Sequence, residues 1–163
     1  MSTCFARPWR GFTLIEMVVT VAIVALLATV ALPMAEIGVK RSREQELRLA
    51  LREIRTALDA YKQAVEEGRV AHAMQQSGYP ESLQILVEGV PDASSPDRRK
   101  VIHFLRRIPR DPMVADPAGP DEDTWGKRSY ASSHDSPEEG DDVFDVYSQA
   151  PGIGLNGVPY RQW

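Results

Sequence analysis

An unbroken apolar run from Phe12 to Ala35 constrains this 163-residue chain more than any other feature. As an α-helix the run would rise about 36 Å, which is enough to cross the hydrocarbon core of a bilayer. Glu16 is its only ionisable side chain. A charge within a membrane helix costs about 2.5–3.5 kcal/mol at the bilayer centre and less near an edge. The run therefore predicts one membrane-spanning segment whose single acid needs a compensating partner.

The rest of the chain is polar, with proline, glycine and charged residues throughout, and suits one modest soluble domain. A net charge of −4, without a basic face of interleaved aromatics, argues against nucleic acid as a partner. The basic cluster Lys40-Arg41-Ser42-Arg43 is expected to meet lipid headgroups. Cys4 is the single cysteine and precedes the apolar run, so a chain that loses this end needs no disulfide.

The flanks of the apolar run bear on its orientation. Arg7 and Arg10 precede the run, as in a signal peptide, but the run is too long for a signal h-region. Basic residues lie on both sides, so the positive-inside rule alone does not settle the topology. With the bulk of the chain on the C-terminal side, we expect the short N-terminal tail in the cytoplasm.

The stretch Gly11-Phe12-Thr13-Leu14-Ile15-Glu16 resembles the cleavage and methylation signal of type IV pilins and type II secretion pseudopilins. The resemblance implies that a prepilin peptidase cuts between Gly11 and Phe12 and that the new amino group of Phe12 is N-methylated. It also implies that Glu16 pairs with the N-terminal amine of a neighbouring subunit during filament assembly. A buried carboxylate is tolerable when an opposite charge meets it, so Glu16 would set the axial register. The alternative is an acid that snorkels to the membrane edge.

An amphipathic pattern follows Pro33 and predicts one helix from near Phe12 to about Glu67, with a bend or local break at Pro33. Its apolar positions step by three and four residues and form a single stripe, which we expect to pack against a globular domain: Leu47, Leu51, Ile54, Leu58, Tyr61 and Val65.

Shorter elements are predicted beyond this helix. A short helix is expected over Glu81–Val87, and strands over Trp125–Ser132 and Val143–Ser148, joined by the acid-rich segment 137–142. Segment 90–100 is predicted to be a surface loop, and segment 101–108 either a strand or a short helix.

The same order resembles the major pseudopilin of type II secretion, in a "YP" turn, Asp111-Pro112, Trp125-Gly126 and the segment 144–148. The implied fold class is α+β, a long N-terminal helix packed on a small C-terminal antiparallel sheet. Four segments follow: a leader peptide 1–11, a transmembrane and assembly helix 12–35, its amphipathic continuation 36–68, and a periplasmic globular region 69–163.

Major pseudopilins commonly bind calcium in the loop after the last strand pair. The corresponding loop here, 149–157, has no carboxylate, so Asn156 and backbone carbonyls would make only a weak calcium site. We expect no cofactor and no metal, with a weak calcium loop near Asn156 as the alternative. The acidic runs 121–123 and 138–142 are expected to be solvated.

The glycines of 152–157 match G-x-G-x-x-G, but no helix can follow them to hold a dinucleotide.

No catalytic set is predicted, and we expect that the protein is not an enzyme. Ser132-Ser133-His134-Asp135 places triad residue types side by side, whereas a triad needs them brought together from separate elements.

The terminal Tyr160-Arg161-Gln162-Trp163 is expected to dock back against the sheet, with a subunit contact as the alternative.

These features favour a structural subunit of a type II secretion pseudopilus, anchored by one pass in the bacterial inner membrane with its C-terminal domain in the periplasm. The expected partners are other pseudopilin subunits, the prepilin peptidase, the inner-membrane assembly platform and membrane lipid. One alternative is a type IV pilus minor pilin. The other is a membrane-anchored periplasmic binding or enzymatic domain that uses the helix only as an anchor.

Overall fold

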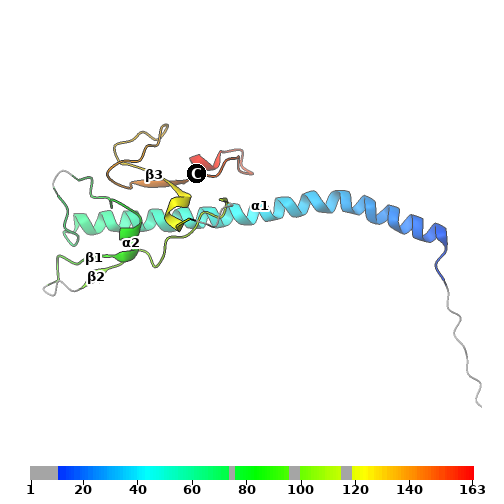
Figure 1. The fold of residues 1–163 in the computed structure, drawn as a ribbon, viewed down its shortest axis with the longest axis horizontal. Coiled ribbons are helices and arrows are strands. Elements are labelled where there is room, and N and C mark those ends of the chain that lie inside the picture. Colours follow the sequence, from blue (N-terminus) through cyan, green and yellow to red (C-terminus); the bar gives the residue numbers. More distant parts are fainter. Residues whose placement is uncertain (1–10, 74–75, 96–99, 115–118) are drawn as a thin grey trace, which may run out of the picture. The chain divides into compact units, whose positions relative to one another are not determined.

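The computed structural model describes residues 11–73, 76–95, 100–114 and 119–163. The predicted leader lies outside them except for Gly11. The chain divides into two compact units, the second of which covers 41–163. The fold is α+β, as predicted (Figure 1). In chain order the elements are α1 (Leu14–Glu66), α2 (Gln84–Glu88), β1 (Val90–Pro91), β2 (Val101–Ile102), the 3-10 helix η1 (Asp121–Thr124), β3 (Trp125–Arg128), β4 (Asp145–Ser148) and the 3-10 helix η2 (Tyr160–Gln162).

The helix α1 agrees closely with the predicted helix at both of its ends. The backbone N–H of Met17 donates to the carbonyl of Thr13 at 3.1 Å and marks the first turn. The helix continues through Pro33, so of the predicted bend or local break the break is not observed. A proline removes one backbone hydrogen bond and strains its preceding turn, but the flanking leucine, methionine and alanine residues favour helix enough to carry it through.

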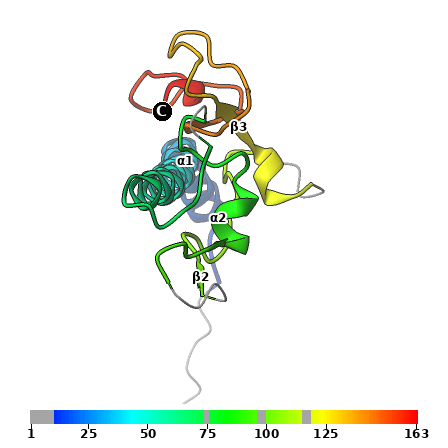
Figure 2. The same cartoon turned by 90° about the vertical axis from the view of Figure 1, so that its left-hand side faces the viewer.

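The second unit is built on the later turns of α1. All six residues of the predicted apolar stripe are buried, with Leu47 and Ile54 fully inaccessible, so this prediction is confirmed. They pack in one core with residues from the rest of the unit, including Leu83, Leu86, Trp125 and Val146. Viewed along α1, β3 and the C-terminal segment lie on one side of the helix and α2 and β2 on another (Figure 2).

The main sheet pairs β3 with β4 antiparallel, from Trp125 opposite Ser148 to Arg128 opposite Asp145. Both predicted strands lie in the right place but are shorter than expected. After β3 the backbone N–H of Ser129 donates to the carbonyl of Glu138 at 3.0 Å, which folds the connection onto the strand end. Gly126 allows β3 and β4 to pair at this point, because a Cβ there would lie 2.3 Å from the ring of Tyr147.

Two smaller elements differ from the prediction. Val90–Pro91, assigned to a surface loop, pairs as β1 with Val101–Ile102 as β2. The predicted helix over Glu81–Val87 is observed as the shorter α2, which begins three residues later and ends one residue later, before Gly89, whose φ of 80° favours glycine. Both differences arise because contacts with residues outside β1 and α2 determine where these elements form. The backbone N–H of Phe104, for example, donates to the carbonyl of Leu86 at 2.9 Å.

Candidate processing and assembly site

The predicted scissile bond joins Gly11 to Phe12 directly before α1. Residues 11–13 are not helical, and the side chain of Phe12 is 77% exposed. A Cβ at Gly11 would meet no atom within 4 Å. The bond therefore lies in exposed, non-helical chain directly before a long helix, where a peptidase has access to it.

Glu16 lies in the first turn of α1, three residues after Thr13. The backbone N–H of Glu16 donates to Oγ1 of Thr13 at 3.3 Å, so Thr13 caps the helix. Thr13-x-x-Glu16 is the spacing of a capping box, and a carboxylate is favoured near a helix N-terminus by the helix dipole. Glu16, which is predicted to act in assembly, therefore also has a local role at the helix start, one that the Thr13-x-x-Glu16 spacing indicates. Its side chain is exposed, and so it can still meet a cation from another molecule.

The first unit offers apolar surface on every side. Each described side chain from 11 to 39 is exposed, including those of Ile15, Val24 and Leu26 at 71%, 64% and 69%. A helix that is apolar all round is normally covered by lipid or by other helices. By length and composition α1 is suited to crossing a membrane.

A family model described as the prokaryotic N-terminal methylation motif matches residues 10–32. The match includes Gly11, Phe12 and Glu16. The motif indicates a type IV pilin-like protein. Proteins with this signal are processed by a prepilin peptidase, and the apolar helix supports membrane anchoring of this chain. Comparisons with curated proteins and with solved structures gave no match.

In the second unit, Glu44 attaches the C-terminal segment to α1. Its side chain is buried, and Oε1 accepts hydrogen bonds from the backbone N–H of Leu155 at 2.8 Å and from the hydroxyl of Tyr160 at 3.0 Å. The two bonds span more than 110 residues of sequence. A buried carboxylate is stable when donors of this kind satisfy it.

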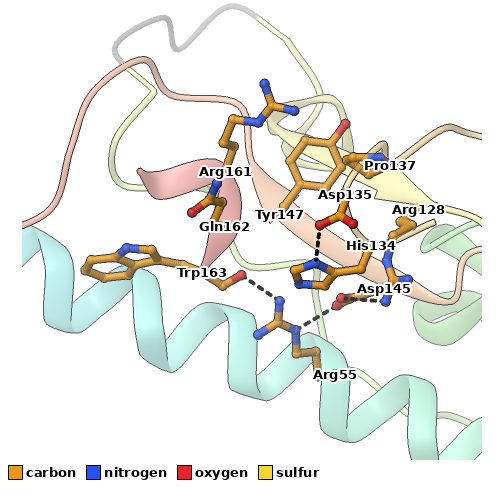
Figure 3. A pocket seen from close by; sticks show the side chains of 10 residues that line it. All are labelled: Arg55, Arg128, His134, Asp135, Pro137, Asp145, Tyr147, Arg161, Gln162 and Trp163. Carbon is orange, nitrogen blue, oxygen red and sulfur yellow. Dashed lines mark hydrogen bonds and ion pairs between the residues drawn. The ribbon is translucent and has the colours of Figure 1, made fainter. Parts of the chain in front are cut away.

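Arg55 makes a second attachment of the C-terminal segment, further along α1 than Glu44 (Figure 3). Its Nε lies 2.7 Å from Oδ1 of Asp145, and its NH2 group donates to the main-chain oxygens of Trp163 at 2.7 Å and Val146 at 3.1 Å. The predicted docking of the tail is thus observed, although it involves α1 as much as the sheet.

The ring of Trp163 completes the attachment. The guanidinium carbon of Arg48 lies 4.5 Å from the ring centroid, a cation–π geometry, and the indole Nε1 donates to the carbonyl of Val158 at 3.2 Å. Gly154 lies under the ring, where a Cβ would come within 2.4 Å of it. The glycine is therefore required by a close approach of the backbone to the tail.

Asn156, the predicted centre of a weak calcium loop, is engaged within its own loop. Its Oδ1 accepts the backbone N–H of Val158 at 3.1 Å. The prediction that no carboxylate serves this loop was incomplete, because Glu44 reaches it from α1. Both described hydrogen bonds to Glu44 come from protein groups, so Glu44 anchors this loop to α1. In the described ranges no three His, Cys, Asp or Glu side chains are arranged to hold a metal ion.

In the acidic run 121–123, Asp121 and Asp123 are exposed as predicted, whereas Glu122 is half-buried. Oε1 of Glu122 lies 2.9 Å from Nζ of Lys127 and accepts the backbone N–H of Leu83 at 3.3 Å. Asp121 pairs with Arg110 at 3.2 Å. Glu122 and Asp121 hold η1 against its neighbours. Whether these acids are paired depends on contacts with residues distant in sequence, which local composition does not reveal.

A surface depression of about 330 Å³ lies beside the docked tail. Its lining includes His134, Asp135, Arg161 and the Arg55–Asp145 pair (Figure 3). Nδ1 of His134 lies 3.7 Å from Asp135, whereas the hydroxyl of Ser132 donates to the carbonyl of Ser129. The structure therefore does not join Ser132 to His134 as a nucleophile and base would require.

The phenol of Tyr160 gives a pH-dependent test of the docked tail. Burial, and then the hydrogen bond to Glu44 and its charge, raise the pKa of Tyr160 to about 12. Because the pKa in the unfolded chain is about 10, the stability from this group is complete below pH 10 and is lost as the pH rises toward 12. We expect the free energy of unfolding to fall over that window. Tyr160→Phe should remove this part of the pH dependence, and a phenol that ionises at its ordinary pKa would contradict the docking.

Proposed function

We propose that the chain is a structural subunit of a type II secretion pseudopilus. After cleavage by the prepilin peptidase and N-methylation of Phe12, it is polymerised from the inner membrane by the assembly platform, and its second unit lies in the periplasm. The work of the protein is assembly with other pseudopilin subunits, and it is not an enzyme. The observation that carries the proposal is the methylation motif over 10–32, together with an exposed Gly11–Phe12 bond next to a capped helix.

The chemistry of Glu16 supports assembly through the first unit. Cleavage would create a positive amine at Phe12, four residues before a carboxylate in the same apolar surroundings. Within one helix both charges lie at the same end, so a neighbouring helix shifted along the axis can bring amine and carboxylate together. The apolar side chains that are exposed in the single chain, including those of Val18 and Leu27, would then be covered by neighbouring helices.

Intact-mass and N-terminal peptide analysis of the protein from membranes of its native cell tests the first step. We expect a mature chain that begins at Phe12 with one added methyl group. Gly11→Val should retain the leader, whereas Gly38→Val serves as a matched control, because a Cβ at either glycine meets no atom within 4 Å. A chain that keeps its first residues in the wild type would overturn the proposal and favour a simple membrane anchor.

A second measurement separates the pseudopilus from the alternatives. Deletion of the gene should leave exported proteins trapped in the periplasm while surface pili remain. Loss of surface pili with normal secretion would instead assign the chain to a type IV pilus as a minor pilin. If neither changes, the membrane-anchored periplasmic domain is the better account.

A further inference from the structure

Three arginines form a basic stripe on the exposed face of α1 in the second unit. Arg41, Arg48 and Arg52 are separated by seven and four residues, so they lie on one face of the helix, away from the core. Arg48 stacks on Trp163, and in the described parts of the chain Arg41 and Arg52 have no ion-pair partner. Like charges four residues apart, as Arg48 and Arg52 are, weaken an isolated helix, so the arginine stripe has a cost.

The connection between β3 and β4 carries the opposite charge. Glu138, Glu139 and Asp141 are exposed there, and none of the three has an ion-pair partner among the residues whose placement is described. This acidic loop is held in a defined conformation. The backbone N–H of Ser129 donates to the carbonyl of Glu138, and the N–H of Tyr130 donates to Oδ1 of Asp142 at 2.8 Å.

The two charged surfaces lie at different levels along α1. Tyr130, at the base of the acidic loop, stacks on Tyr79 with a centroid distance of 6.0 Å. Nζ of Lys62 lies 5.7 Å from the centroid of Tyr79, which places Tyr130 near the last turns of α1. Between Arg52 and Lys62 the helix rises roughly 15 Å. The connection also reaches Pro137, which lines the same depression as Arg55, yet among the described residues no ion pair joins the three acids to Arg41 or Arg52.

We propose that the acidic loop of one subunit docks on the arginine stripe of the next. This inference rests on the proposed function, since it names the contact by which the second units of a filament follow one another. The contact joins two different surfaces that are offset along one axis, so it repeats without closing and generates an open array. Charge complementarity selects the register and the orientation of the incoming subunit. An anionic membrane could also bind the stripe, but a second copy accounts for both surfaces.

Disulfide cross-linking of the full chain in native membranes tests the contact. Gln45 is exposed and lies among the three arginines, and Ser136 is exposed beside the acids. In a Cys4→Ser background, Gln45→Cys with Ser136→Cys keeps every charge and should give a ladder of dimers, trimers and larger species on oxidation. Either cysteine alone should stop at dimers or below. Gln84→Cys with Ser136→Cys is the matched control and should give no ladder, because Gln84 lies on α2.

Charge reversal then separates contact from proximity. In the double-cysteine chain, Arg52→Glu or Glu139→Arg should lower the ladder roughly tenfold, and the two together should restore it. Arg106→Glu reverses an exposed arginine outside the stripe and should leave the ladder unchanged. The variants retain the core, so a folded domain by circular dichroism is expected for each.

Every other outcome overturns the docking. A processed chain that still polymerises but gives no ladder would reject this contact and leave the proposed function intact. If Arg52→Glu leaves the ladder unchanged and lowers binding to phosphatidylglycerol vesicles, the stripe is a lipid-binding surface. A chain that is neither cleaved at Gly11 nor polymerised would reject the docking and the proposed function together.

Discussion

Glu16→Ala is expected to yield a folded, membrane-inserted protein that no longer assembles. Without the carboxylate, the amine of a neighbouring subunit would be buried in apolar surroundings without a counter-charge, at a cost of about 3–5 kcal/mol for each contact. Polymer yield should therefore fall by roughly two orders of magnitude. Sedimentation of detergent-extracted filaments, with membrane fractionation of the same cells, measures assembly and insertion separately.

The matched control for this variant is Glu36→Ala, which removes an exposed acid later in the same helix. It should assemble normally. Loss of the capping-box contribution at Glu16 would cost only about 1 kcal/mol, and the hydroxyl of Thr13 would still cap the helix, so a folding defect does not explain a complete loss. Normal polymer from Glu16→Ala would contradict the register argument.

Glu44→Ala should have the largest effect on the stability of the second unit. The change removes the acceptor for the N–H of Leu155 and for the hydroxyl of Tyr160 and leaves both donors without a partner. Hydrogen bonds to a charged group contribute about 1.5–3 kcal/mol, so we expect unfolding to become easier by about 3 kcal/mol. Urea denaturation followed by tryptophan fluorescence gives this value, and also reports the release of Trp163.

Two companion variants define this effect. Glu44→Gln keeps one oxygen acceptor and should lose less stability than alanine does. Glu46→Ala removes an exposed acid two residues away and should stay within about 0.5 kcal/mol of the wild type. A Glu44→Ala protein as stable as Glu46→Ala would show that Glu44 does not hold the C-terminal segment.

The sequence was most informative where structure depends on neighbours in the chain. The apolar stripe of α1 is a local periodicity, and the alternation before Ser148 located β4, so both elements were predicted. The processing site was readable for the same reason, because Gly11, Phe12 and Glu16 form one short motif. The pair β1 and β2 was missed, since Val90–Pro91 is too short to show any period and is paired only through Val101–Ile102.

Glu44 was missed because its partners are distant in sequence. It stands in a charged stretch with Arg43 and Glu46, and composition alone does not separate a buried acid from an exposed one. One signal was present: Glu44 precedes Leu47 by three residues and Leu51 by seven, which places it on the apolar stripe. An acid on a core face requires donors, and the donors came from Leu155 and Tyr160.

The close approach of Gly154 to the indole of Trp163 has a consequence for comparing sequences. Any side chain at 154 would displace the ring, so the two positions are expected to vary together among relatives of this chain. A relative with a bulky residue at 154 should lack an aromatic residue at 163, or place it elsewhere. This pair therefore serves as a marker, readable from sequence alone, of chains whose C-terminal segment is attached in this way.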